Sequence, residues 1–341
     1  MTTPRPTSEP TGRGDPARRR AAAVLVLPAV ALLVPLLGPQ IALDGTGEGT
    51  APGSTAVTAL RTLMLGALCV HAGELFGLLL VRRLPLPTEA DEPAAPGSWA
   101  TGAAVVGFLA ALGLALIVST GNLVTLDLSR MDVGGLYGTR DGALALITVN
   151  GFLAAGLCAG GRRPGLAALP LFAVVLAEAL RAHPEVHSPL FGSALTLVHL
   201  GSAALWTGGL LYVLRVLYAW RRAAPARGTA LLGAYSRVAL VLFAALTVTG
   251  AVSAARRLPP DDLLTTAYGR VLLAKVLLVA AVAVLAVLAR RRLRGQADPV
   301  AVAAPARAEV LVLLVVVAVS ALLTAMPLPV FYRAAFWWTW F

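Results

Sequence analysis

Charged residues are scarce in this chain of 341 residues. They make up 13% of the sequence, while 58% is hydrophobic, whereas soluble globular domains have near 25% charged residues. The mean hydropathy of +0.79 is too high for a water-soluble domain. The composition therefore excludes a soluble enzyme or binding module and predicts a polytopic membrane protein.

Soft metal ligands and catalytic motifs are also few. The chain has 2 cysteines and 4 methionines; Cys69 and Cys158 lie in apolar runs, so no disulfide framework is expected. So few methionines argue against a relay of thioether ligands. The sequence has no phosphate-binding glycine loop, Ser-His-Asp arrangement or Cys-X-X-Cys pair. We therefore expect neither an enzyme nor an ATP-driven pump.

The net charge of +11 could suggest a nucleic-acid partner, but the arginines stand in short clusters between apolar runs. That placement is typical of membrane topology, so no nucleic acid is expected. Because short basic loops stay in the cytoplasm, the clusters predict a cytoplasmic N-terminus and an external C-terminus. The main clusters are Arg82 with Arg83, Arg162 with Arg163, Arg221 with Arg222, and 290–292.

The apolar runs predict an all-α bundle. A bilayer core needs about 20 apolar residues per helix, which gives about nine spans, at 21–39, 57–81, 100–120, 142–160, 164–181, 190–217, 230–254, 269–289 and 308–326. The first resembles a signal sequence, but its length and its Pro28 and Pro35 favour a retained span. We expect a disordered cytoplasmic segment (1–20), an N-terminal membrane bundle (21–181), a second membrane domain (182–327) and an aromatic tail (328–341). The acidic loop 84–98 is predicted to be disordered and solvated.

The span 57–81 carries ionisable and soft side chains. Met64, His71 and Glu74 share one face of the predicted helix, with Cys69 roughly opposite. Because sulfur and imidazole suit copper, this stripe is a candidate metal path. In the alternative reading, His71 and Glu74 bond to each other or to neighbouring helices, and Met64 packs.

More histidines stand near the start of the span 190–217. His183 and His187 lie in the preceding loop, and His199 lies two to three turns inside the helix. Neutral imidazoles bind copper, so these residues are candidate ligands at the outer mouth. The alternative is an ordinary polar loop and a histidine bonded across helices. Gly208 and Gly209 are expected to allow close helix packing.

Three segments carry a resemblance to a known family. HLGSAALWTGGL (199–210), YSRVALVLFAALTVTG (235–250) and LLTTAYGRVLLAKVLLV (263–279) resemble, in order and spacing, the copper resistance protein D (CopD) family of bacterial inner-membrane proteins. RAHPEVHSPLFGSALTLVH (181–199) looks like the family's His-bearing loop. The close resemblance covers about residues 181–327, and the N-terminal half matches only as a set of apolar spans.

The resemblance implies copper transport across the cytoplasmic membrane, inward, in copper homeostasis or resistance. It implies His183 and His199 as ligands, and a separate extracytoplasmic copper-binding protein as partner. The residues that match the family pattern are expected to anchor helices or gate the path, since protonated Arg and Lys offer no lone pair to copper. They are Trp206, Gly208, Gly209, Tyr235, Arg237, Tyr268, Gly269, Arg270 and Lys275.

Two other functions remain open from the sequence. A b-type haem protein would hold its iron between His71 and His199. A copper-delivery or assembly factor for a respiratory oxidase would carry no ion across the membrane.

Overall fold

The computed structural model describes residues 16–49, 53–84, 94–121, 131–182, 188–295 and 299–327. In these ranges the chain is helical, without a β-strand, which confirms the expected fold class. The helices are α1 (Pro16–Leu43), α2 (Ser54–Arg82), α3 (Ala100–Ser119), α4 (Val133–Gly138), α5 (Arg140–Ala159), α6 (Ala168–Arg181), α7 (Pro189–Trp220), α8 (Pro225–Arg257), α9 (Ala267–Gly295) and α10 (Pro299–Leu323).

Within the described residues, 7 helical segments are long and apolar enough to cross a membrane. They are α2, α3, α5, α6 with the 3-10 turn before it, α7, α8 and residues 267–288 of α9. The two other expected spans, 21–39 and 308–326, coincide with α1 and α10. The chain is therefore a multi-pass membrane protein.

Local sequence explains several helix starts. Pro189 and Pro225 occupy the first positions of α7 and α8, where the missing N–H has no helical partner to lose. Thr139 and Asp132 accept backbone N–H groups at the starts of α5 and α4, as N-caps do. The short helix α4 was not expected from the sequence.

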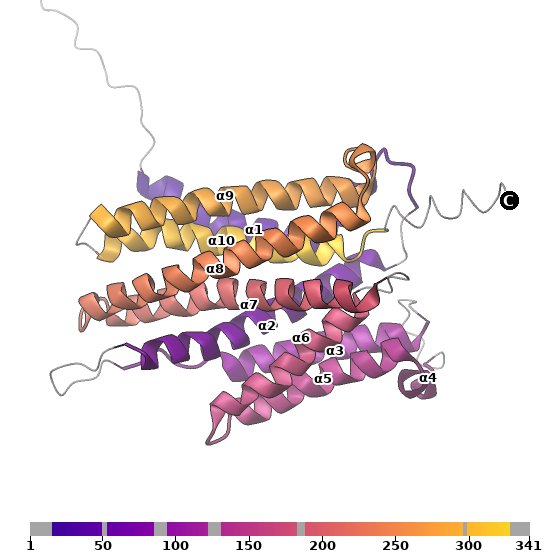
Figure 1. Cartoon of the computed structure of the whole chain (residues 1–341), viewed down its shortest axis with the longest axis horizontal. Coiled ribbons are helices and arrows are strands. Elements are labelled where there is room, and N and C mark those ends of the chain that lie inside the picture. Colours follow the sequence, from indigo (N-terminus) through magenta and orange to yellow (C-terminus); the bar gives the residue numbers. More distant parts are fainter. Residues whose placement is uncertain are drawn as a thin grey trace, which may run out of the picture.

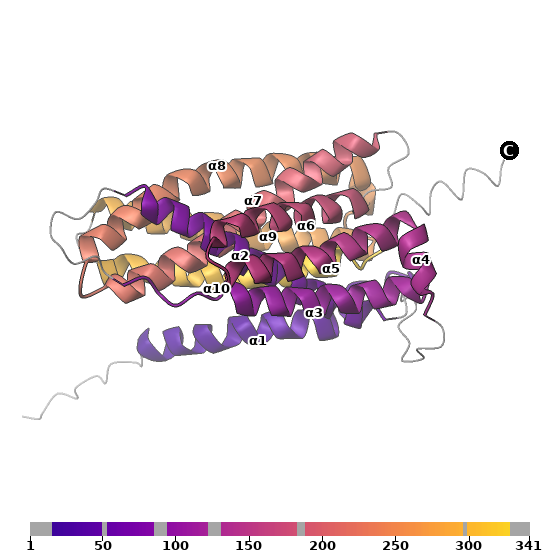
Figure 2. The same ribbon diagram turned by 90° about the horizontal axis from the view of Figure 1, so that it is seen from below.

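The long helices run along the length of the molecule, and α2 lies at its centre (Figures 1 and 2). α2 packs on α3, α7, α10 and α1. On one side of α2, α5 packs on α3 and α6 packs on α5. On the other side, α8 packs on α7, and both α1 and α9 pack on α10. The C-terminal ends of α2, α5, α7 and α9 share one end of the bundle, at the left of Figure 1. Because these ends lead into the arginine clusters, the arrangement agrees with the alternation that the charge pattern predicts.

Consecutive helices α8 and α9 do not form a tight pair. α8 packs mainly on α7, and α9 packs mainly on α10. In Figure 1 the two helices diverge as they leave the loop that joins them. Both expose large apolar side chains, for which lipid is the natural neighbour; these include Leu240, Val241 and Val248 of α8 and Val276, Leu277 and Val284 of α9.

Candidate functional site

The backbones of α2 and α7 meet at Gly73 and Gly208. A Cβ atom added to Gly73 would overlap the main chain of Gly208, and one added to Gly208 would overlap the carbonyl of Cys69. One turn further, the ring of Tyr212 lies over Gly77. Small residues therefore bring these two helices into direct backbone contact, as is common in membrane bundles.

On its other side α7 is tied to α8. The Tyr235 hydroxyl donates to the Trp206 carbonyl at 2.6 Å. The Trp206 ring meets Phe243 edge-on, with 5.5 Å between ring centroids, and Tyr235 also leaves little space over Gly209. Trp206, Gly209 and Tyr235 thus hold α7 against α8, in line with the expected packing role.

His199 faces the same side of α7. Its Nδ1 lies 3.0 Å from the Thr249 hydroxyl of α8. Thr249 donates its single proton to the Ala245 carbonyl, at 2.6 Å. The threonine oxygen is then left to accept from Nδ1–H, which fixes the tautomer and leaves the Nε2 lone pair of His199 without a proton. The ring packs beside Gly250, whose missing side chain makes room for it.

Two cationic side chains act electrostatically on this imidazole. Lys275 of α9 and Arg257 at the end of α8 both lie within electrostatic reach of His199. Lys275 is half-buried, and Arg237, further along α8, is exposed. The positive charge of Lys275 acts on His199.

His71 lies inside the bundle. Its side chain is 0% exposed, and neither ring nitrogen has a hydrogen-bond partner in the described part of the protein. Leu60, on the same face of α2, packs over Gly113 of α3, so His71 points toward α3. Met64 is 2% exposed on this face, but it stands seven residues away, about 10 Å along the axis. His71 and Met64 therefore do not share one coordination sphere.

The two membrane histidines do not face a common space. His71 lies about 160° around α2 from the contact at Gly73, and His199 about 180° around α7 from Gly208. The α2–α7 contact stands between them. This arrangement argues against a haem held between the two imidazoles, and it separates the candidate metal path along α2 from His199. The sequence predicts which residues share a face of one helix, but it does not predict which neighbouring helix packs against that face.

Glu74, one turn from His71, is already occupied. It is 4% exposed and accepts from the Ser98 hydroxyl, from the Trp99 N–H at 2.9 Å and from Arg215 of α7 at 3.4 Å. Carboxylates with such partners are stable in a bundle interior. The expected metal-ligand role of Glu74 competes with these bonds.

The same network holds the segment before α3. Arg215 also donates to the Gly97 carbonyl, and its guanidinium lies 3.7 Å from the centre of the Trp99 ring. Trp220 donates to the Ala94 carbonyl at 3.1 Å. The prediction of a disordered loop is therefore wrong for 94–98, because buried side chains of α2 and α7 bind this backbone; residues 85–93 lie outside the described residues.

Glu178, in α6, is a second buried carboxylate. It accepts from Thr148 at 3.2 Å, pairs with Arg181 at 3.1 Å and lies within electrostatic reach of Arg61. These groups tie α2, α5 and α6 together near one end of the bundle.

Three residues of the family pattern, Tyr268, Gly269 and Arg270, lie in the first turn of α9, which begins at Ala267. Thr266 accepts from the Gly269 N–H, which makes it the N-cap. A Cβ at Gly269 would strike the Leu263 carbonyl, so a close turn requires the glycine. Tyr268 is buried.

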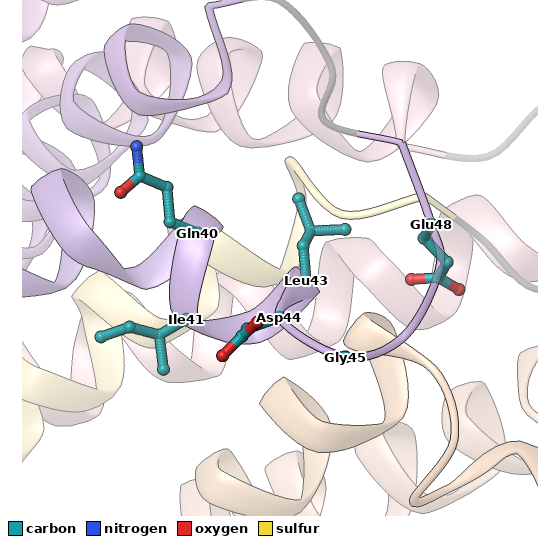
Figure 3. Close-up of a pocket in the computed structure, with 6 residues that line it drawn as sticks. All are labelled: Gln40, Ile41, Leu43, Asp44, Gly45 and Glu48. Carbon is teal, nitrogen blue, oxygen red and sulfur yellow. The ribbon is translucent and has the colours of Figure 1, made fainter.

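The loop after α1 covers this helix start. Glu48 accepts from the Ala267 N–H at 3.0 Å, and Arg270 donates to the Asp44 carbonyl at 2.6 Å. Asp44 and Glu48 also line a shallow pocket of about 460 Å³ with Gln40, Ile41, Leu43 and Gly45 (Figure 3). Because Glu48 serves as a helix cap, it is a structural contact of α9.

Two candidate ligands, His183 and His187, lie outside the described residues. Among the residues that are described, no group of three or more His, Cys, Asp or Glu side chains could hold a metal ion. Sequence reasoning missed Thr249, Arg215 and Trp99, which meet His199 and Glu74 only after folding. The one signal was Arg215 itself, a charge inside an apolar span.

Comparison with known proteins connects this geometry to a family. Residues 229–323, which comprise nearly all of α8 and the whole of α9 and α10, match the family model described as CopD, copper resistance protein D. Searches of curated proteins and of solved structures gave no match. The match confirms the resemblance for this segment, which contains Tyr235, Arg237, Tyr268 and Lys275.

The fold and this match define a class: a multi-pass helical membrane protein with a copper-related domain. That domain is of the copper resistance protein D type, and Thr249, the partner of His199, belongs to it.

Proposed function

We propose that the protein carries copper ions across the cytoplasmic membrane, inward, as part of copper homeostasis or resistance. The match of residues 229–323 to the copper resistance protein D family supports copper as the transported ion. The apolar helices support a membrane path. The protein is proposed to act as a transporter without a catalytic reaction.

The observation that carries this proposal is the bond between His199 and Thr249. Histidines that bind metals commonly donate one ring N–H to a neighbouring oxygen, which orients the ring and fixes the tautomer. The Nδ1–Thr249 contact of 3.0 Å has this form. The Nε2 atom of His199 is then the copper ligand.

Lys275 and Arg257 favour release of a copper ion from His199 over its storage there. Their positive charge near His199 opposes long retention of a cation. A storage site would instead surround the metal with carboxylates or thiolates. His183 and His187, in the segment before α7, would capture the ion from a separate extracytoplasmic copper-binding protein.

The test is copper-dependent growth of cells that carry either the native chain or His199→Ala. The variant is expected to insert and accumulate normally but to lose the copper effect. Normal copper accumulation by the variant would remove His199 from the path. Unchanged cellular copper on deletion of the gene, with loss of oxidase activity, would instead identify an assembly factor.

A further inference from the structure

His71 is the one fully buried imidazole whose two ring nitrogens both lack a partner among the described residues. An unpaired polar group inside an apolar bundle costs free energy, on the order of 1–3 kcal/mol. Ionisable groups inside a membrane bundle commonly mark functional sites. Its place on the α3 side of α2 separates it from His199, so it does not belong to the site proposed above.

Glu74 supplies the charge that a cation at His71 needs. It lies one turn along the same face of α2, and the two groups interact electrostatically. The buried residues in the first turns of α3, the helix that His71 faces, are small and apolar, and include Ala100, Ala103 and Ala104. A dry site with one imidazole and few donors suits a soft monovalent cation better than a divalent ion, which needs more polar ligands.

The carboxylate of Glu74 is, however, shared with Arg215. Their contact of 3.4 Å is longer than the 2.9 Å contact between Glu74 and the Trp99 N–H. One carboxylate does not neutralise two cations, so a positive ion at His71 weakens the attraction between Glu74 and Arg215. The segment 94–99 depends on both residues, through Ser98, Trp99 and Gly97.

We propose that His71, with Glu74 as counter-charge, binds a soft monovalent cation, and that its binding releases segment 94–99 from Glu74 and Arg215. The proposal rests on the proposed function, with Cu(I) as the physiological ion. Segment 94–99 lies at the arginine-rich end of the bundle, which the charge pattern assigns to the cytoplasm. Its release would open the arginine-rich end of the bundle next to His71, at a site separate from His199.

Hydrogen exchange measured by mass spectrometry tests this on the full-length protein in detergent, with Ag⁺ as the redox-inert probe. Saturating Ag⁺ is expected to raise the exchange rate of the Trp99 amide, which donates to Glu74, at least tenfold. His71→Ala should abolish the response. Glu74→Ala should exchange fast with or without Ag⁺, because it removes the acceptor of the Trp99 N–H.

His199→Ala is the matched control, because His199 lies on the opposite face of the α2–α7 pair, and it should keep the response. No change of exchange with Ag⁺ in the native protein, or a response that survives in His71→Ala, would overturn the proposal. Copper uptake is measured separately. Native vesicles that take up no copper contradict the proposed function, whereas uptake with an unresponsive segment 94–99 contradicts only the release.

Discussion

His71 and His199 stand on opposite faces of the α2–α7 helix pair, with the contact between Gly73 and Gly208 between them. The first faces α3 in the N-terminal half of the bundle. The second bonds to Thr249 in the segment of copper resistance protein D type. The two histidines therefore define two sites, and their effects should be separable by single substitutions.

The contact between α2 and α7 at Gly73 and Gly208 leaves no room for a side chain. Gly208→Ala should lower the free energy of unfolding by about 1–3 kcal/mol, as overpacking does, because its Cβ would overlap the Cys69 carbonyl. Gly201, two turns away on α7, has open space, so Gly201→Ala should leave stability unchanged or raise it by up to about 1 kcal/mol. Detergent unfolding measures both. Equal stability of the two variants would mean that α2 and α7 are not in contact at Gly208.

Thr249 should orient the ring of His199, the proposed copper ligand. Thr249→Val removes the oxygen that accepts from His199 Nδ1, and weakens copper affinity by about 10–100-fold, as losses around metal ligands do. Thr247, on the same helix, is exposed and bonds only to its own helix carbonyl, so Thr247→Val is the control. Titration of the purified protein with Cu(I) gives both affinities. Unchanged affinity in Thr249→Val would contradict the Nε2 ligand.

The purified protein should be free of haem. The two imidazoles face different neighbours, so they cannot serve as the two axial ligands of one iron. An absorption spectrum is therefore expected to lack a Soret band, both as isolated and after addition of haemin. A stoichiometric Soret band that disappears in His71→Ala and in His199→Ala alike would show that both bind one haem.

Tyr235 should act through packing. Tyr235→Phe loses the hydroxyl bond to the Trp206 carbonyl and lowers the free energy of unfolding by about 1 kcal/mol, while copper uptake per folded molecule stays unchanged. Tyr218, exposed on α7, offers the control Tyr218→Phe. If Tyr235→Phe abolished uptake at full stability, the hydroxyl would belong to the ion path.

Much of the fold follows from the apolar runs alone. Every expected span coincides with a helix, because a run of that length must satisfy its backbone within the membrane. The apolar runs do not predict which helices pack against each other, because a helix face that contacts lipid is as apolar as one that contacts another helix. The runs of α3 and α9 give no clear buried face. The contact between Gly73 and Gly208, 135 positions apart in the chain, becomes visible only in the fold.

The sequence predicts the candidate site less completely than it predicts the fold. The sequence singled out His71, Glu74 and His199 because ionisable groups are costly inside a membrane. Their partners could not be predicted, because Thr249 and Arg215 come from helices whose facing sides are set by packing. The disorder predicted for the loop 84–98 is wrong for its last residues for the same reason, because Glu74 and Arg215 bind the backbone there.

Copper uptake into membrane vesicles of defined sidedness tests the central claim most directly. Vesicles that contain the native protein should accumulate radioactive copper in the inward direction. Those that contain His199→Ala should fall to the level of vesicles without the protein, at equal protein content. Equal uptake by the native protein and His199→Ala, or none by the native protein, would contradict the account.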